Sequence, residues 1–194
     1  MALQIMKARK KGENAFPSND IESLVEIALK VVANNIKMYP ELEGVEDPNV
    51  LQSIVKLINL DLPITTTARN VEFEFYWEKK CKQLKNCRKE DHGNSYKQAF
   101  IERRIEQLLE NHKDDASLPV LEEELYSARY DVFCLKIGQL LSHLNMETVF
   151  QHLPNLSHLT LTYGAKHVGM EYERPLFGMK MSDAKTFSES LKIT

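Results

Sequence analysis

Apolar residues recur at helical spacing through much of the chain, beginning with a stripe near the N-terminus. That stripe consists of Ile21, Leu24, Val25, Ala28, Leu29 and Val32. Residues that recur every three or four positions lie on one face of a helix, so the pattern predicts an amphipathic helix ending near Asn35. Asn19 followed three positions later by Glu22 is a capping pair, which indicates where this helix begins.

A second helix is predicted from Pro48 to about Leu60. Proline suits the first helical position, and Asp47 before it can accept a hydrogen bond as the cap. The apolar face of this helix comprises Val50, Leu51, Ile54, Val55 and Ile58. We interpret residues 61–67 as extended or loop-like, because a residue before proline avoids the helical region and three consecutive threonines disfavour a helix.

Residues 71–87 combine an aromatic group with a basic run. The aromatic residues are Phe73, Phe75, Tyr76 and Trp77, and the lysines are Lys79, Lys80, Lys82 and Lys85. Aromatic rings beside lysines can stack nucleic-acid bases. Aromatic residues crowded at the start of a helix are more often core anchors with the lysines on the solvated side, and we favour that interpretation.

Two more amphipathic helices are predicted before residue 130. The first is capped by Ser95 and runs over residues 96–112, with its charged residues Glu102, Arg103, Arg104 and Glu106 mostly off the apolar stripe. The second covers residues 118–129, with Leu121, Leu125 and Ala128 facing inward. Its acidic residues 122–124 are interpreted as a solvated helix face.

The pattern changes near Tyr130, where a spaced leucine motif occurs twice. Residues 132–137 and 156–161 both read LxxLxL in apolar character, and their starting positions are 24 residues apart (156 minus 132). Leucine-rich repeats have periods of roughly 20 to 29 residues, and the LxL core of each forms a short strand in a parallel sheet. The apolar residues between the two motifs suit a helical return, and residues 182–191 are interpreted as the capped helix before another strand.

Alternation along these strands predicts which side chains face outward. Leu135, Ile137, Leu159 and Leu161 are expected to stack inside the sheet. Four others are expected on the concave face, where they are candidate partner-binding residues: Lys136, His158, Thr160 and Thr162.

The expected fold is therefore mainly α, with a helical region that leads into the first strand–helix units of a leucine-rich-repeat array, an α/β solenoid. Residues 1–17 are interpreted as a flexible basic tail, residues 18–130 as a helical N-terminal domain, and residues 131–194 as the start of the repeat domain. The tail carries further candidate partner-binding residues: Lys7, Arg9, Lys10 and Lys11. These could touch an acidic surface such as tubulin, but only their charge supports that, and we favour a solvated tail.

Composition excludes several classes of function. The chain has 194 residues and a formal net charge of -3, whereas nucleic-acid-binding domains usually have a strong basic excess. No apolar run reaches the roughly 18 residues that a membrane span needs, and the N-terminus lacks the residue order of a secretory signal, so we expect a cytoplasmic protein. The three cysteines, Cys81, Cys87 and Cys134, match neither a metal knuckle nor a disulfide framework and are interpreted as buried, inert thiols.

Catalytic, cofactor and metal sites are not expected. His143, His152 and His158 lack accompanying ligands at a recurring metal spacing. The chain has no GxSxG elbow, no arrangement of Cys, His and acid from which a triad could be argued, and no phosphate-binding glycine loop.

Several segments resemble a known family. The stretch 153–164 (LPNLSHLTLTYG), its continuation through 169–173 to 177–184 (FGMKMSDA), and the upstream segments 61–64, 76–81 and 92–97 are similar to the T-complex-associated testis-expressed protein 1 family. This is the leucine-rich-repeat subunit 5 of the nexin-dynein regulatory complex. The resemblance covers most of the chain from about Ile21, but the chain has none of the later repeats of family members.

The resemblance implies a non-enzymatic scaffold in the axoneme of motile cilia and flagella. Its expected partners are other subunits of the complex and proteins of the doublet microtubules, and its expected role is to help link neighbouring doublets and regulate dynein-driven sliding. The alternative is a cytosolic leucine-rich-repeat adaptor, either an F-box-like recruiter for ubiquitin transfer or a regulator of GTPases.

Overall fold

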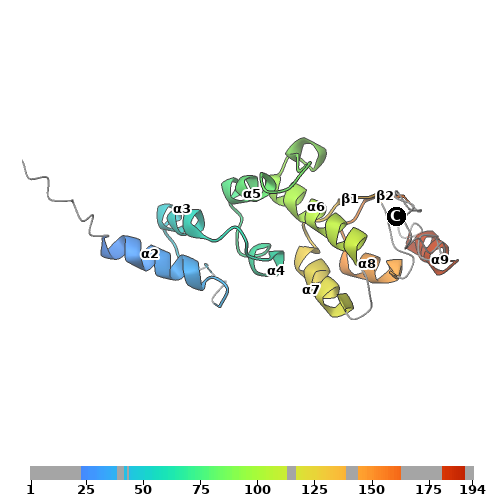
Figure 1. The fold of residues 1–194 in the computed structure, drawn as a ribbon, viewed down its shortest axis with the longest axis horizontal. Coiled ribbons are helices and arrows are strands. Elements are labelled where there is room, and N and C mark those ends of the chain that lie inside the picture. Colours follow the sequence, from blue (N-terminus) through green and yellow to red (C-terminus); the bar gives the residue numbers. More distant parts are fainter. Residues whose placement is uncertain are drawn as a thin grey trace, which may run out of the picture.

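A computed structural model describes residues 23–38, 42, 44–112, 117–138, 144–162 and 181–190. These residues are mainly helical, and Figure 1 shows α2 and α3 at one end of the array and α9 at the other. The helices are α2 (Leu24–Asn35), α3 (Pro48–Leu57), α4 (Ile64–Thr67), α5 (Glu74–Cys81), α6 (Tyr96–Asn111), α7 (Leu118–Ala128), α8 (Met146–His152) and α9 (Met181–Ser190), with a 3-10 turn at Lys89–Asp91. The strands are β1 (Cys134–Ile137) and β2 (His158–Leu161). The mainly helical prediction is confirmed, whereas the leucine-rich-repeat solenoid stays a prediction.

Helix α2 forms as predicted, but it packs through a different face. A capping box formed by Ser23 and Glu26 begins the helix, while the predicted capping pair at Asn19 and Glu22 lies outside the described residues. Ala33 and Ile36 are buried, with Leu29 packed beside them. Most of the predicted apolar stripe, including Leu24, is exposed. The prediction failed here because helical spacing identifies an apolar face and not the element that covers it.

Helix α3 begins at Pro48 with Asp47 as its cap, as predicted, and ends at Leu57. The loop predicted for residues 61–67 is wrong in part, since α4 forms one helical turn there. Pro63 adopts the extended conformation expected of a helix N-cap, and the Thr67 hydroxyl donates to its carbonyl oxygen at 3.1 Å. Burial of Ile64 and Thr67 outweighs the low helix propensity of threonine.

The aromatic group forms the centre of the core, as predicted. Tyr76 and Trp77 on α5 are almost wholly buried, and the Trp77 ring lies 5.7 Å from the ring of Phe100 on α6. The Trp77 indole donates to the carbonyl oxygen of Val71 at 2.7 Å, which satisfies its polar group inside the core. These contacts join α5 to α6.

Lys80 corrects the prediction that the lysines of this segment lie in solvent. Its side chain is only 3% exposed, and its ammonium nitrogen donates to the carbonyl oxygen of Leu62 at 2.6 Å. The same nitrogen lies 4.8 Å from the centre of the Phe100 ring. Burial, with a contribution from the charge of Arg104, lowers the pKa of Lys80 to about 8.

This buried lysine predicts a stability that rises with pH. Between about pH 8 and the ordinary lysine pKa of 10.5, the unfolded chain holds a proton that the folded chain has released, so unfolding becomes harder as pH increases. We expect the free energy of unfolding to rise by about 2 kcal/mol from about pH 7 to about pH 10, relative to Lys80→Met. Urea denaturation of both proteins tests this, because other titrating groups cancel in the difference. Equal pH slopes for the two proteins would contradict it.

Helices α6 and α7 lie where the sequence predicts. Ser95 caps α6, and the three inward residues predicted on α7 are buried. The charged residues differ from expectation, since Glu102 and Glu106 on α6 and Glu124 on α7 are buried. Burial raises the pKa of Glu124, with the repulsion of Glu123 adding to it.

The two spaced leucine motifs form a parallel strand pair. Cys134 pairs with His158 and Ile137 with Leu161, so the register keeps the separation of 24 residues (158 minus 134) seen in the sequence. Helix α8 lies between the strands in the chain, and Met146 and Val149 point its apolar side into the core. This strand–helix–strand unit is the arrangement that a first repeat requires.

Candidate protein-interaction site

The exposed face of the strand pair brings together the four residues predicted there. Lys136 on β1 pairs with Thr160 on β2, and His158 and Thr162 precede and follow Thr160 along the alternation. All four are exposed, whereas the alternating Leu135 and Ile137 are buried. The other predicted partner-binding residues, Lys7, Arg9, Lys10 and Lys11, lie outside the described residues.

The two strands differ in how well their apolar side chains are covered. Leu135 and Ile137 of β1 are buried, but Leu159 and Leu161 of β2 are only half-buried. Among the described residues, β2 pairs with β1 alone. The outer edge of β2 has no strand partner within the described ranges.

The opposite edge of the sheet is closed by carboxylates from α6. The Glu102 carboxylate accepts hydrogen bonds from the amides of Phe133 and Cys134 at 2.7 and 2.8 Å. Glu106 accepts from the amide of Lys136 at 2.6 Å, and Glu110 from the amide of Gly138 at 2.5 Å. We call Glu102, Glu106 and Glu110 the carboxylate ladder.

The spacing of the ladder follows from helix and strand geometry. Residues four apart on a helix rise by about 6 Å. Residues two apart on a strand, whose amides face the same edge, are separated by about 6.6 Å. A glutamate every fourth residue of α6 can therefore meet every second amide of β1.

Neighbouring side chains fix the ladder in place. The Glu102 side chain is wholly buried, where the His92 ring contacts one carboxylate oxygen and the Gln98 amide donates to the other at 2.9 Å. Arg103 forms an ion pair with Glu106 at 2.8 Å. Each buried carboxylate thus has donors for both oxygens, which offsets the cost of removing it from water.

The carboxylate ladder makes the two edges of the sheet different. An unpaired strand edge offers amides and carbonyls to any other strand, which invites aggregation. On β1 the outward amides donate to carboxylates of α6, so this edge is closed to another strand. Helix α6 therefore serves as the cap of the strand pair at its β1 edge.

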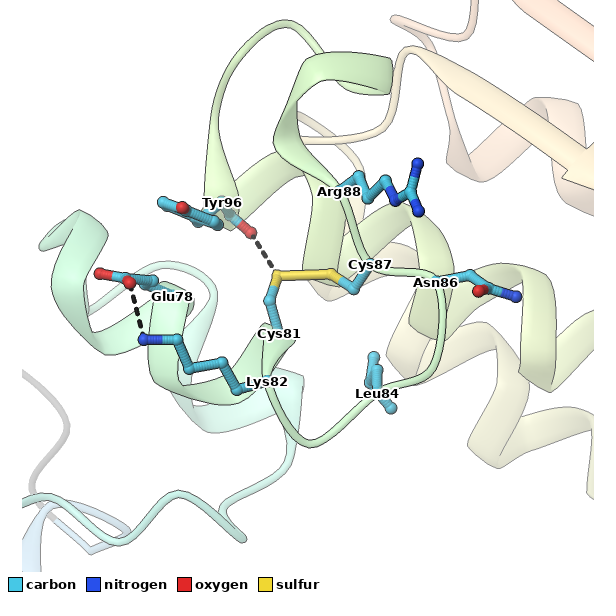
Figure 2. Close-up of a pocket in the computed structure, with 8 residues that line it drawn as sticks. All are labelled: Glu78, Cys81, Lys82, Leu84, Asn86, Cys87, Arg88 and Tyr96. Atoms are coloured by element: carbon cyan, nitrogen blue, oxygen red, sulfur yellow. Dashed lines mark hydrogen bonds and ion pairs between the residues drawn. A yellow bond between two sulfur atoms is a disulfide. The ribbon is translucent and has the colours of Figure 1, made fainter.

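A cavity of about 380 Å³ lies at the end of α5, away from the strands, and Figure 2 shows the residues that line it. Cys81 and Cys87 form a disulfide on its wall, which corrects the prediction that both are inert thiols. Glu78 and Lys82 form an exposed ion pair at 2.7 Å, and this contact lowers the pKa of Glu78 and raises that of Lys82. The lining contains no buried acid–base pair that would indicate catalysis.

The remaining cysteine lies on the exposed face of β1. Burial raises the pKa of the Cys134 thiol, and the negative charge of Glu102 raises it further. The thiol therefore stays protonated at neutral pH, which is the opposite of an activated nucleophile. Cys134 is only partly buried, which differs from the burial predicted for it, and its inertness stays a prediction.

Two other kinds of site are absent from the described ranges. No group of three or more His, Cys, Asp or Glu residues there could hold a metal ion. No helix in those ranges is both long and apolar enough to cross a membrane. The strand face and its capped edge remain the best-defined candidate site.

Sequence reasoning missed the ladder although a signal was present. Glu102, Glu106 and Glu110 recur at intervals of four on the helix immediately before the first strand motif. The sequence predicts only that Glu102 and Glu106 lie mostly off the apolar stripe, and glutamates in such positions are usually solvated. The alternation of buried and exposed residues along β1, taken with the four-residue spacing of the glutamates, could have indicated that these side chains meet every second amide of the strand.

Comparison with known proteins identifies relatives of the chain. The chain is 36% identical over 179 residues to dynein regulatory complex subunit 5 from Chlamydomonas reinhardtii, an alignment that covers 91% of this chain. The chain is thus related to proteins named dynein regulatory complex subunit 5. Two mammalian members are more distant, at 25% identity for the mouse protein and 23% for the human protein, each over 199 residues and 87% of this chain. No family model matches.

The similarity to dynein regulatory complex subunit 5 confirms the predicted resemblance. The alignments cover 46% of the Chlamydomonas protein and 40% of the mouse and human proteins. The chain thus spans about half the length, or less, of the curated relatives it matches.

Proposed function

We propose that this chain is a non-enzymatic structural subunit of a dynein regulatory complex in the axoneme of a cilium or flagellum. There it would help to link neighbouring doublet microtubules and regulate dynein-driven motility through protein–protein contacts. The observation that carries the proposal is the 36% identity, over 91% of the chain, to a protein named for that complex. The described residues add an exposed strand face and a capped sheet, which suit a scaffold.

In this proposal the helical region is the cap of a leucine-rich-repeat solenoid. The carboxylate ladder would close the first strand, and a repeat strand would add at the outer edge of β2. Lys136, His158, Thr160 and Thr162 would then lie on the concave surface, where they contact another subunit of the complex. Lys7, Arg9, Lys10 and Lys11 would provide a second contact with an acidic surface, such as tubulin.

The test uses a flagellated cell whose own gene for dynein regulatory complex subunit 5 has been deleted. The tagged chain and a Lys136→Glu/His158→Glu variant are expressed, and axonemes are extracted with increasing salt. We expect the wild-type chain to stay with the doublets together with subunits of the complex, and the variant to be released at lower salt. Lys56→Glu, an exposed charge reversal on α3, is the matched control and should behave as wild type.

Two outcomes would contradict the proposal. Absence of the wild-type chain from cilia would exclude an axonemal role. Recovery with a cullin adaptor or a GTPase, in place of axonemal proteins, would favour the alternative of a cytosolic leucine-rich-repeat adaptor. If wild type and variant left the doublets at the same salt concentration, the strand face would not be the contact surface, but the axonemal role would still stand.

A further inference from the structure

Two arginines and two tyrosines gather on the surface where α4 packs against α7 (Figure 1). Tyr126 and Tyr130 are 47% and 58% exposed, so both rings are open to solvent. The guanidinium carbon of Arg69 lies 4.8 Å from the centre of the Tyr126 ring. The guanidinium carbon of Arg129 lies 4.3 Å from the same ring centre and 4.4 Å from that of Tyr130. We call Arg69, Tyr126, Arg129 and Tyr130 the arginine–tyrosine cluster.

The packing of α4 on α7 holds the two guanidiniums in place. Arg69 follows α4 and is 57 residues from Tyr126 in the sequence, yet its guanidinium donates to the carbonyl oxygen of Tyr126 at 3.5 Å. Arg129 comes three residues after Tyr126 at the end of α7, and residues three apart share a helix face. Stacking on the rings restricts both side chains before any ligand arrives, which lowers the entropic cost of binding.

The charges of the two arginines are not neutralised by a neighbouring carboxylate. Within the described ranges, the ion pairs involve neither Arg69 nor Arg129. Hydrogen bonding to Arg69 lowers the pKa of Tyr126, and the charges of Arg129 and Arg69 lower it further. Both charges that act on this exposed phenol are therefore positive, and the surface around it attracts anions.

The geometry of a stacked guanidinium indicates which anion fits. Stacking uses the flat face of the group and leaves the N–H donors along its edge directed away from the ring. Two parallel donors on that edge match the two oxygens of a carboxylate. Tyrosine and arginine are also the residues that most often dominate the binding energy of protein interfaces. The arginine–tyrosine cluster thus suits a carboxylate that another protein presents.

A neighbouring acid limits the length of the ligand. Glu123 is exposed on α7, three residues before Tyr126. A long polyanion such as a nucleic acid that ran along α7 would meet this negative charge. A short acidic segment needs only the two guanidiniums, so the charges around the cluster favour a peptide over a nucleic acid.

We infer that the arginine–tyrosine cluster binds a short acidic segment of another polypeptide, whose carboxylates pair with Arg69 and Arg129. The inference uses only the surface formed by α4 and α7, so it does not depend on membership of a dynein regulatory complex. Whichever assembly contains the chain, this surface provides a contact separate from the face of the strand pair.

Two synthetic peptides test the inference on the full chain. One carries four consecutive glutamates between glycine–serine ends, and the other carries glutamine in their place. Fluorescence anisotropy should show the glutamate peptide binding at least about tenfold more tightly than the glutamine peptide. The affinity for the glutamate peptide should fall as salt increases, because screening weakens exposed charge pairs.

Substitutions within the cluster locate the binding. Arg69→Gln and Arg129→Gln should each weaken binding of the glutamate peptide at least about fivefold. Arg69→Lys keeps the charge but not the planar pair of donors, so it should retain only part of the affinity. Arg88→Gln, at an exposed arginine beside the cavity at the end of α5, is the matched control and should bind as wild type does. Circular dichroism confirms that each variant folds, and the exposed Arg69 decides the test if the half-buried Arg129 cannot be replaced.

Four outcomes would overturn the inference. The first is no binding of the glutamate peptide, or equal affinity for the two peptides. The second is equal weakening by Arg69→Gln and Arg88→Gln, which would indicate general attraction by positive charge. The third is a lower stability of Arg69→Gln with unchanged binding, because the cluster would then only join α4 to α7. The fourth is tighter binding of a single-stranded uridine oligonucleotide than of the glutamate peptide at the same salt concentration, which would assign the surface to a nucleic acid.

Discussion

Replacing Glu102 with alanine will lower the free energy of unfolding by about 3 to 5 kcal/mol, because its buried partners are then left without an acceptor. The amides of Phe133 and Cys134 and the side chain of Gln98 all donate to one oxygen of this carboxylate. His92, which contacts the other oxygen, is also buried. Urea denaturation followed by circular dichroism measures the loss.

Two matched variants show whether the ladder has the role assigned to it. Glu102→Gln keeps the shape and one acceptor oxygen but removes the charge, so its loss should be about half as large. Glu110→Ala removes the acceptor of a single amide from a half-buried position and should cost about 1 kcal/mol. Equal losses in Glu102→Ala and Glu110→Ala would contradict the ranking by burial.

The same variant tests the role of α6 as a cap. Without Glu102 the first amides of β1 have no partner, and the strand edge can pair with another chain. We expect Glu102→Ala to form oligomers at concentrations where wild type and Glu110→Ala keep the same sedimentation. Retention of the wild-type sedimentation by Glu102→Ala would show that other contacts keep this edge closed.

The helices and strands were largely predictable because their signals are local. Asp47 and Ser95 cap the helices that follow them, Trp77 anchors the core, and the spaced leucine motifs at residues 132–137 and 156–161 form strands in the expected register. Caps, apolar periodicity and alternation depend on neighbours in the sequence. These local signals therefore identify helices and strands, but they do not show how the helices and strands pack together.

The errors arose where a partner far along the chain decides the environment of a residue. Lys80 and Glu102 resemble charged residues on a solvated helix face, yet both are buried. Lys80 donates to the carbonyl oxygen of Leu62, and Glu102 accepts from amides of β1. Leu24 looks like a core residue, yet α3 packs on another side of α2. Periodicity alone cannot distinguish an apolar helix face that the same chain covers from one that the chain leaves exposed.

Trp77→Ala will lower the free energy of unfolding by about 3 to 5 kcal/mol, the range for removing a large aromatic side chain from a core. Trp77 is wholly buried, and the centre of its ring lies 5.3 Å from that of Tyr76 and 5.7 Å from that of Phe100. Because it is the single tryptophan of the chain, circular dichroism must replace intrinsic fluorescence as the measurement. Trp77→Phe should lose about 1 to 2 kcal/mol, since a ring is kept and the hydrogen bond to Val71 is lost.

The effect of Trp77→Ala should extend to the strand pair, because Phe100 lies two residues before Glu102 on the same helix. Loss of the Trp77 ring weakens the packing of α6 against α5. The carboxylate ladder is part of α6, so its position changes as well. We expect faster hydrogen exchange at the amides of Phe133, Cys134 and Lys136 in Trp77→Ala than in Val120→Ala, whose exposed side chain contributes little. Exchange that increases only around α5 would mean that the core and the capped sheet are stabilised independently.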